Sequence, residues 1–147
     1  MVQIVRIFEG LPEAVEALTD EARAEGFHHI GAMALDWASG AMRYDREGEA
    51  LFAAFVDGEL AAVGGVTLEE MDPALSHARR MRRLYVRPAH RRRGVGRTLA
   101  GAMIQQGFAC ASVLTVNAGT PDAPAFWEAL GFESDARAGH THVLRTA

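Results

Sequence analysis

The sequence LYVRPAHRRRGVGRTL, residues 84–99, decides the fold of this chain. An apolar segment typical of a strand ends at Pro88, a loop follows in which Gly94 and Gly96 stand one residue apart, and a helix-forming segment begins at once. Glycines at a helix start let a ligand approach backbone N–H groups, which carry the positive end of the helix dipole. The stretch therefore indicates an anion-binding loop. Taken alone, it is equally compatible with a plain strand–turn–helix connection whose arginines are solvated.

The composition is that of an ordinary soluble globular protein. The 147 residues are 49% hydrophobic and 23% charged, with a net charge of −4, so we expect one domain over residues 1–147 and no general nucleic-acid binding. All fifteen basic residues are arginine, and nine of them fall within residues 79–97, which favours a local anion site. Cys110 is the only cysteine, and no signal peptide or transmembrane stretch stands out, which predicts a cytoplasmic protein without membrane contact.

Hydrophobic periodicity and turn residues predict a mixed α/β arrangement. The clearest element is a hairpin, in which Asp57-Gly58 joins two strands. One helix is expected with Pro12 in its first turn, and another with Thr120 as its N-cap. The full set of expected strands is 2–8, 50–56, 60–68, 80–86, 112–117, 132 and 141–144, and that of helices is 12–25, 96–106 and 120–130, with 30–42 a helix or a loop.

The glycine loop is followed by a second informative segment. The loop lacks the lysine and glycine spacing of a Walker-type nucleotide loop and the third glycine of the dinucleotide-binding fingerprint. Residues 84–99 instead resemble the acyl-CoA-binding motif of the GNAT superfamily of N-acyltransferases. Val116-Asn117, followed by AFWEALGF at residues 125–132, resembles that family's downstream motif. The strong resemblance covers residues 80–132.

The resemblance implies a fold. It is a mixed α/β, mostly antiparallel sheet flanked by about four helices. A bulge splits this sheet into a V between two parallel strands, which in this chain are residues 80–86 and 112–117. The thioester of acetyl-CoA is expected to lie in that split.

The resemblance also implies the contacts of acetyl-CoA. Backbone groups of residues 84–86 are expected to pair with the pantetheine arm, and an N–H at Val86 to polarise the thioester carbonyl. Backbone N–H groups of residues 92–98 are expected to hold the pyrophosphate. The expected contacts are Leu84, Tyr85, Val86, Arg91, Arg92, Arg93, Gly94, Val95, Gly96, Arg97, Thr98, Asn117 and Phe126.

Proton handling departs from the family pattern at two positions. Trp127 stands where many members carry a tyrosine as general acid, and Arg80 stands where some carry a glutamate as base. The substitute catalytic candidates are Glu69, Glu70 and Tyr85. The alternative for the two glutamates is a solvated hairpin end, and for Trp127 it is core packing.

Strand alternation suggests how the acceptor is held. It places Arg80 and Arg82 on one face with Leu84 and Val86, the face expected to line the cleft. We therefore expect one of these arginines to contact an acidic group of the acceptor, and Trp37 to line the acceptor side. The alternatives are a plain exposed strand end for the two arginines and core packing for Trp37.

These expectations describe an acetyl-CoA-dependent N-acetyltransferase without a metal. It would act on a primary amine of a small molecule, by direct attack in a ternary complex. Dimers are common among similar proteins, so a homodimer is one possible assembly, but the sequence does not determine the oligomeric state. The alternatives are an acetyltransferase for proteins or peptides, and a CoA-binding module that has lost catalysis.

Overall fold

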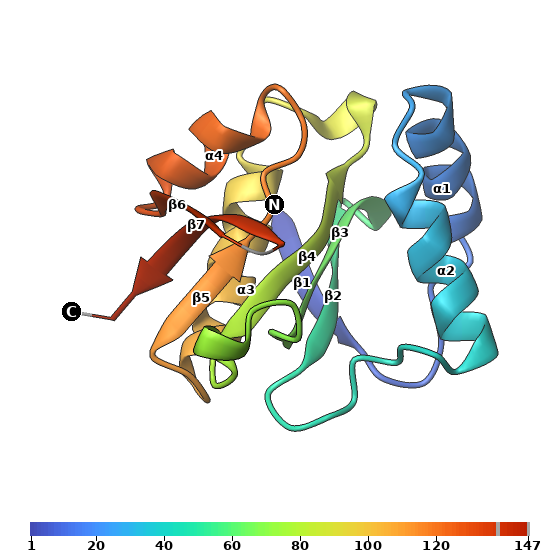
Figure 1. The fold of residues 1–147 in the computed structure, drawn as a ribbon. Coiled ribbons are helices and arrows are strands. Elements are labelled where there is room, and N and C mark those ends of the chain that lie inside the picture. Colours follow the sequence, from blue (N-terminus) through green and yellow to red (C-terminus); the bar gives the residue numbers. More distant parts are fainter. Residues whose placement is uncertain (138, 147) are drawn as a thin grey trace.

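The computed structural model describes residues 1–137 and 139–146, and its strands form one seven-stranded sheet (Figure 1). The strand order is β1-β2-β3-β4-β5-β7-β6, and every neighbouring pair is antiparallel except β4 and β5. The elements are β1 (Val2–Ile7), α1 (Val15–Ala24), α2 (His29–Ser39), β2 (Ala50–Val56), β3 (Glu59–Leu68), β4 (Arg79–Val86), α3 (Val95–Phe108), β5 (Val113–Val116), α4 (Ala123–Ala129), β6 (Glu133–Arg137) and β7 (His140–Arg145). The mixed, mostly antiparallel sheet expected from the sequence is confirmed.

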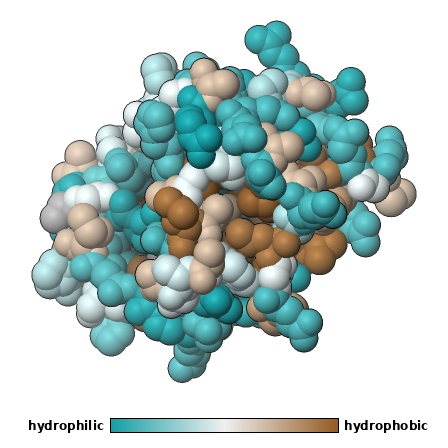
Figure 2. Space-filling view, turned by 90° about the vertical axis from the view of Figure 1, so that its right-hand side faces the viewer, coloured by the Kyte–Doolittle hydropathy of each residue, from teal (hydrophilic) through white to brown (hydrophobic). Residues whose placement is uncertain are grey.

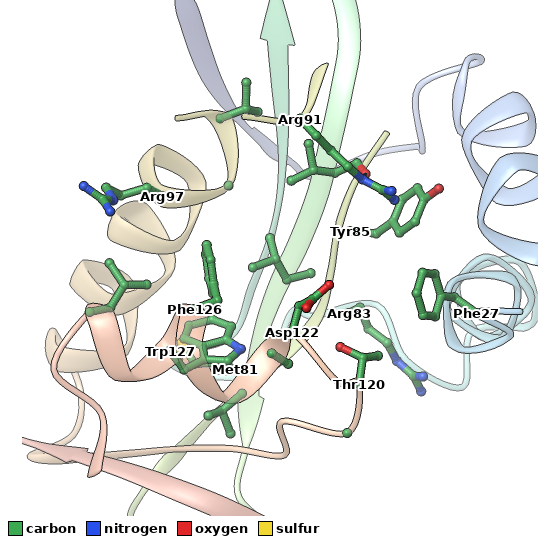
Figure 3. Close-up of a pocket in the computed structure, with 18 of the residues that line it drawn as sticks. Phe27, Met81, Arg83, Tyr85, Arg91, Arg97, Thr120, Asp122, Phe126 and Trp127 are labelled. Atoms are coloured by element: carbon green, nitrogen blue, oxygen red, sulfur yellow. The ribbon is translucent and has the colours of Figure 1, made fainter. Parts of the chain in front are cut away.

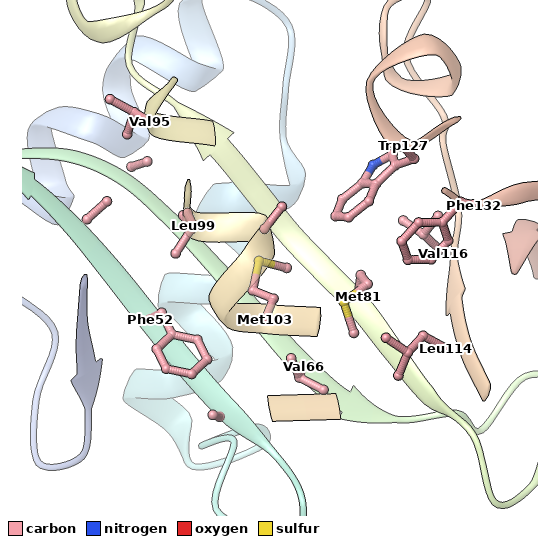
Figure 4. Close-up of a cluster of buried hydrophobic side chains, with 14 of the residues drawn as sticks. Phe52, Val66, Met81, Val95, Leu99, Met103, Leu114, Val116, Trp127 and Phe132 are labelled. Carbon is pink, nitrogen blue, oxygen red and sulfur yellow. The ribbon is translucent and has the colours of Figure 1, made fainter. Parts of the chain in front are cut away.

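The helices cover both faces of the sheet. On one face α1 and α2 bury Leu18 and Met33 in a core cluster that also contains Tyr85 of β4. On the other face α3 and α4 contribute Leu99 and Trp127 to a second cluster (Figure 4). Strand β4 therefore separates two cores, and side chains on its two faces enter different surroundings.

The surface over α1 and α2 is mixed in character. Apolar residues gather near the middle of this side, amid a mainly hydrophilic surface (Figure 2). Leu35 of α2 is among the large apolar side chains left exposed. Within residues 1–137 and 139–146, none of the helices has both the length and the apolar character needed to cross a membrane.

The two parallel strands are joined over only part of their length. Their pairing ends where Met81 of β4 stands opposite Val116 of β5. Strand β4 continues to Val86 while remaining paired with β3 on its other side. The sheet is thus split between β4 and β5, and the later part of β4 has an open edge.

A bulge interrupts β4 close to the point of the split. Two residues of β4, Arg83 and Leu84, stand opposite the single residue Gly64 of β3. Arg83 adopts a φ of +61°, in the left-handed region that bulky side chains seldom occupy. An extra residue of this kind shifts the alternation of the strand by one position.

The bulge makes one prediction wrong. Met81 before it and Leu84 and Val86 after it all pack against the core beneath α3. Arg80 and Arg82, which alternate with Met81, therefore lie on the opposite face, toward α1 and α2. Simple alternation failed here because it assumes an uninterrupted strand.

Several element boundaries differ from those predicted. The Val15 N–H donates to the Pro12 carbonyl at 3.0 Å in a turn that precedes α1, so the proline lies before the helix. Helix α4 begins at Ala123, later than the predicted Thr120 N-cap, and Pro124 lies in its first turn. Residues 29–39 are helical, which decides the helix-or-loop alternative.

The start of the strand that follows α4 also differs from the prediction. Phe132 was predicted to lie in a closing strand, but β6 begins one residue later. Phe132 is instead a buried core residue, 2% exposed, beneath Trp127. Its apolar character reflects core packing rather than strand pairing.

Candidate active site

A cavity of about 1110 Å³ lies along the open edge of β4, between α3 and α4 on one side and the start of α2 on the other. In Figure 3, Phe126 and Trp127 of α4 lie across the cavity from Phe27 and Tyr85. The predicted site residues that line it are Arg80, Arg82, Leu84, Tyr85, Val86, Arg91, Arg92, Gly94, Val95, Gly96, Arg97, Asn117 and Phe126. The predicted site residues outside the lining are Trp37, Glu69, Glu70, Arg93 and Thr98.

The open edge of β4 presents backbone groups to the cavity. The Arg87 N–H donates to the Ala61 carbonyl of β3 at 2.8 Å. In an antiparallel ladder every second residue faces the partner strand, so Tyr85 also faces β3, while Leu84 and Val86 direct their N–H and C=O groups to the split. Two of the three residues expected to pair with an extended ligand are thus oriented for it, and the backbone of Tyr85 is not.

The first turn of α3 closes one end of the cavity. Gly94, at the N-cap, has a φ of +77° and no side-chain cap, so the N–H groups of Val95, Gly96 and Arg97 have no partner within the helix. A Cβ on Gly96 would stand 3.2 Å from Cγ2 of Val86 and 3.4 Å from Cε1 of Phe126. The glycine keeps the helix start open to a ligand, and the helix dipole favours an anion there.

Arg91 makes contacts that its predicted role does not include. Its Nη1 and Nη2 donate to Oε2 and Oε1 of Glu25 at 2.8 and 2.6 Å, and its Nε donates to the Val86 carbonyl at 3.0 Å. Arg91, and then the Tyr85 hydroxyl, lower the pKa of Glu25 by hydrogen bonding to its carboxylate. Arg91 lines the cavity, but its guanidinium is bound within the protein.

Tyr85 is poorly suited to the catalytic role proposed for it. Its hydroxyl donates to Glu25, and its ring packs edge-on against Phe27. Burial and this hydrogen bond raise the pKa of Tyr85, which keeps its proton on the phenol. The side chain shapes the wall of the cavity beside α1.

Glu69 is buried in a polar network rather than solvated at a hairpin end. It accepts hydrogen bonds from the Thr115 hydroxyl at 2.6 Å, the Met71 N–H at 2.7 Å and Arg80 Nη1 at 3.2 Å. Burial acts to raise the pKa of Glu69, but these hydrogen bonds and the charge of Arg80 outweigh it, so the pKa is lowered. The carboxylate holds β3, β4 and β5 together and reaches the cavity only through Arg80.

Two other predicted residues also lie away from the cavity. The Glu70 carboxylate accepts from Arg46 at 2.7 Å and its side chain is 59% exposed, as expected of a solvated strand end. Trp37 is 6% exposed and packs in the core beneath α1 and α2. Trp37 is therefore a core residue and does not line the cavity, contrary to the prediction from the sequence.

Trp127 both packs in the core and borders the cavity. It is 5% exposed and makes edge-on ring contacts, with centroids 5.1 Å apart, to Phe126 and Phe132. An indole at this position supplies shape and apolar surface but no exchangeable acidic proton for catalysis.

The cavity contains residues that sequence reasoning did not select. They include Glu25 and Phe27 near the end of α1, His29 at the start of α2, Arg83 of β4, and Thr120 and Asp122 before α4. Burial, followed by the charge of Arg83, lowers the pKa of His29. No local pattern in the sequence distinguishes the half-buried His29 from its exposed neighbour His28. Among the described residues, no group of three or more histidines, cysteines or carboxylates is arranged to bind a metal.

The three arginines near the bulge differ in what they bind. Arg80 is held by Glu69 and by the Gly139 carbonyl. Arg83 Nη1 donates to the His29 carbonyl at 3.1 Å. The Arg82 side chain makes no hydrogen bond or ion pair with residues 1–137 or 139–146, and its pKa is lowered first by burial and then by the charge of Arg83.

A split sheet whose open strand edge leads to a glycine-rich helix start defines an acyl-CoA-binding type of fold, and comparison with known proteins gives the family. Residues 32–132 match the model of the acetyltransferase (GNAT) family. The chain therefore belongs to this family of acyltransferases, which use acetyl-CoA as acyl donor. No curated protein matches the chain significantly.

Solved structures share the fold over nearly the whole chain. A candidate acetyltransferase from Exiguobacterium sp. 255-15 is 24% identical, with a TM-score of 0.84 over 99% of this chain and 93% of its own. YncA from Salmonella typhimurium, solved with its cofactor acetyl-CoA, is 14% identical, with a TM-score of 0.70 over 98% and 93% of the two chains. Ribosomal-protein-alanine N-acetyltransferase from Brucella melitensis is 16% identical, with a TM-score of 0.70 over 98% and 99%.

Proposed function

We propose that this protein transfers the acetyl group of acetyl-CoA to the primary amine of a small molecule, with residues 1–147 acting as one catalytic domain. One observation carries the proposal: the open edge of β4 leads directly to the uncapped, glycine-lined start of α3 within a single cavity. The edge suits the amide groups of a pantetheine arm, and the helix start suits a pyrophosphate.

The residues present fit acetyl-CoA at each of these positions. Leu84 and Val86 direct backbone groups to the split, where Arg91 bonds the Val86 carbonyl and the Val86 N–H stays available, and Gly96 leaves the space that a Cβ would fill. Arg92 and Arg97 also line the cavity near the helix start, and a guanidinium matches the geometry of a phosphate. Arg91 is assigned a structural part instead, because Glu25 occupies its guanidinium.

Attack of an amine on the acetyl thioester requires stabilisation of the carbonyl oxygen and transfer of protons. Acetyl-CoA supplies an acyl thioester, whose carbonyl carbon accepts the attacking amine. The Val86 N–H is oriented to donate to the carbonyl oxygen as negative charge develops on it. The C–N bond forms as the C–S bond breaks, so a side chain or a water must take the proton that the amine loses, and the departing CoA thiolate must gain a proton to leave as the thiol.

His29 is our candidate for that proton acceptor. Among the described residues, His29 and Asp122 are the acid–base side chains that line the cavity without a hydrogen bond or ion pair. Burial lowers the pKa of His29, so its ring is neutral at neutral pH. A neutral imidazole nitrogen can accept a proton from the amine. The two glutamates proposed from the sequence are bound elsewhere.

Two rival functions remain testable. The resemblance to a ribosomal-protein-alanine N-acetyltransferase favours a protein acceptor. The positions of Trp127 and Arg80, where the family commonly has proton-handling residues, favour a CoA-binding module without catalysis. The two walls of the cavity, formed by Phe27 and Phe126, support a small acceptor.

Measuring the acetylation of candidate acceptors tests this proposal. The purified protein is supplied with acetyl-CoA and, separately, with a panel of small amines and a panel of short peptides, and thiol release is followed. We expect turnover with small amines. Faster acetylation of peptides would support the protein-modifying rival, and acetyl-CoA binding without turnover of any amine or peptide would support the non-catalytic module.

A further inference from the structure

The cavity contains a positive charge that nothing in the described part of the chain neutralises. Arg80 is bound by Glu69 and Arg91 by Glu25, whereas Arg82 has neither an ion pair nor a hydrogen bond with residues 1–137 or 139–146. Asp36 of α2 and Tyr44 act to raise the pKa of Arg82, but neither makes a hydrogen bond or an ion pair with it. An arginine that is partly withdrawn from water normally has an acidic partner.

Arg83 adds a second unsatisfied group at the same place. Its Nη1 donates to the His29 carbonyl, but its Nε is buried and has no acceptor in the described residues. Arg82 and Arg83 both line the cavity, beside the start of α2. The Arg83 Nε itself is out of reach of a ligand, but the positive charges of two adjacent guanidinium groups favour an anion beside the unpaired Arg82.

This site is separate from the one at the start of α3. Arg82 lies four residues before Val86, which corresponds to roughly 10–13 Å along a strand. The two positive regions therefore stand at opposite ends of the open edge. Phosphates of the acyl donor at α3 leave Arg82 and Arg83 available to the second substrate.

The cavity also contains a negative charge without a partner. Asp122 precedes α4 and lies near the middle of the cavity lining in Figure 3, whereas the Arg83 side chain runs toward α2. Its carboxylate makes no ion pair or hydrogen bond with another described side chain. A small molecule with an ammonium group and a carboxylate would complement both unpaired charges.

We propose that Arg82, together with Arg83, binds the carboxylate of the acceptor, and that the acceptor is a small amino acid-like molecule with a primary amine. This inference rests on the proposed function for the identity of the second substrate. It assigns the role predicted for Arg80 or Arg82 to Arg82, since Arg80 is bound to Glu69.

The test compares acids with their uncharged amides. Glycine, alanine, phenylalanine, β-alanine and 4-aminobutyrate, each with its amide, are titrated calorimetrically into the protein saturated with CoA. We expect at least one acid to bind about tenfold or more tightly than its amide, the effect of one charge-assisted hydrogen bond. Arg82→Ala is expected to abolish this preference, and Arg82→Lys to restore part of it.

A matched variant isolates the contribution of Arg82 from a general loss of positive charge. Arg145→Ala removes the same charge from an exposed position on β7 and is expected to keep the preference. The inference is overturned if no acid binds more tightly than its amide, if Arg82→Ala retains the preference, or if 2-aminoethyl phosphate binds more tightly than every carboxylate. Thiol release from acetyl-CoA is measured separately, so turnover without a preference for acids contradicts this inference alone, and binding without turnover contradicts the proposed function alone.

Discussion

The Arg91 guanidinium donates hydrogen bonds to both carboxylate oxygens of Glu25, at 2.8 and 2.6 Å, and its Nε donates to the Val86 carbonyl at 3.0 Å. One side chain thus ties the end of α1 to the last residue of β4. The carbonyl it occupies lies on the open edge of β4, so the residue that stabilises this corner also limits which backbone groups a ligand can use.

Replacing Arg91 and replacing Arg97 are expected to have different effects. Arg97→Ala should raise the KM for acetyl-CoA about tenfold, because it removes a cation beside the helix start. Arg91→Ala should change this KM less and should lower stability by less than about 1 kcal/mol, since the Arg91–Glu25 pair is partly exposed. Initial rates and urea unfolding measure the two effects. Arg93→Ala, which changes the same loop outside the cavity, is the control, and a larger KM effect for Arg91 than for Arg97 would contradict the assignment.

Adding a methyl group at Gly96 is expected to impair binding without unfolding the protein. Gly96→Ala places a Cβ against Val86 and Phe126, so we expect a several-fold higher KM for acetyl-CoA. Gly101→Ala is the matched control in the same helix, because a Cβ there meets nothing within 4 Å. It should raise stability by about 0.5–1 kcal/mol and leave KM unchanged. Equal KM values for the two variants would show that the helix start does not contact the donor.

Glu69 is expected to act on stability rather than on catalysis. Glu69→Gln breaks its buried pair with Arg80 and should lower the free energy of unfolding at pH 7 by about 3 kcal/mol. The lowered pKa of Glu69 means that its stabilising contribution is present above the unfolded-state pKa, near 4.5, and is lost as pH falls through the folded-state pKa. The difference between wild type and variant should therefore shrink below about pH 4.5.

Urea unfolding at several pH values measures this contribution. Glu70→Gln is the control, since its partly exposed pair with Arg46 contributes less than about 1 kcal/mol. A large loss of kcat in a fully folded Glu69→Gln protein would instead identify this residue as the base.

His29 is expected to govern activity at low pH. A base must be unprotonated, and the pKa of His29 lies below its usual value of 6.5, so the acidic limb of the rate profile should lie below pH 6.5. His29→Gln should remove that limb and lower kcat/KM about 100-fold. The profile of kcat/KM against pH tests this, with exposed His28→Gln as the control. A profile unaltered in His29→Gln would transfer the role to Asp122 or to water.

Trp127 is expected to contribute shape and not a proton. Trp127→Phe should keep kcat within about threefold, since no proton passes through the indole, and lower stability by about 1–2 kcal/mol through lost packing. Thermal unfolding and kcat at saturating substrates measure the two quantities. A hundredfold fall in kcat without unfolding would assign the indole a direct part in the reaction.

The helix start that lines the cavity could be predicted from the sequence because its features are local. Pro88, Gly94 and Gly96 mark the end of a strand and the start of a helix within a few residues, and the structure places that helix start in the cavity. The hairpin around Asp57-Gly58 follows from turn chemistry in the same way.

The acceptor side depends on contacts between distant segments, which local patterns do not encode. His29 enters the cavity wall beside Arg83, 54 residues away, and Glu69 is held by Thr115, 46 residues away. The bulge was expected from the family, but its position was not, because Arg83 adopts a positive φ without being a glycine. Each of these outcomes is decided by packing between elements.

The extra residue at Arg83 has a consequence for how this strand tolerates change. Arg82, just before it, faces α1 and α2, and Leu84, just after it, faces α3, although one residue alone separates the two. A substitution at Arg82 therefore changes the cavity wall toward α1 and α2 and leaves the packing of Leu84 against the α3 core undisturbed, so the two faces of this strand can be altered independently.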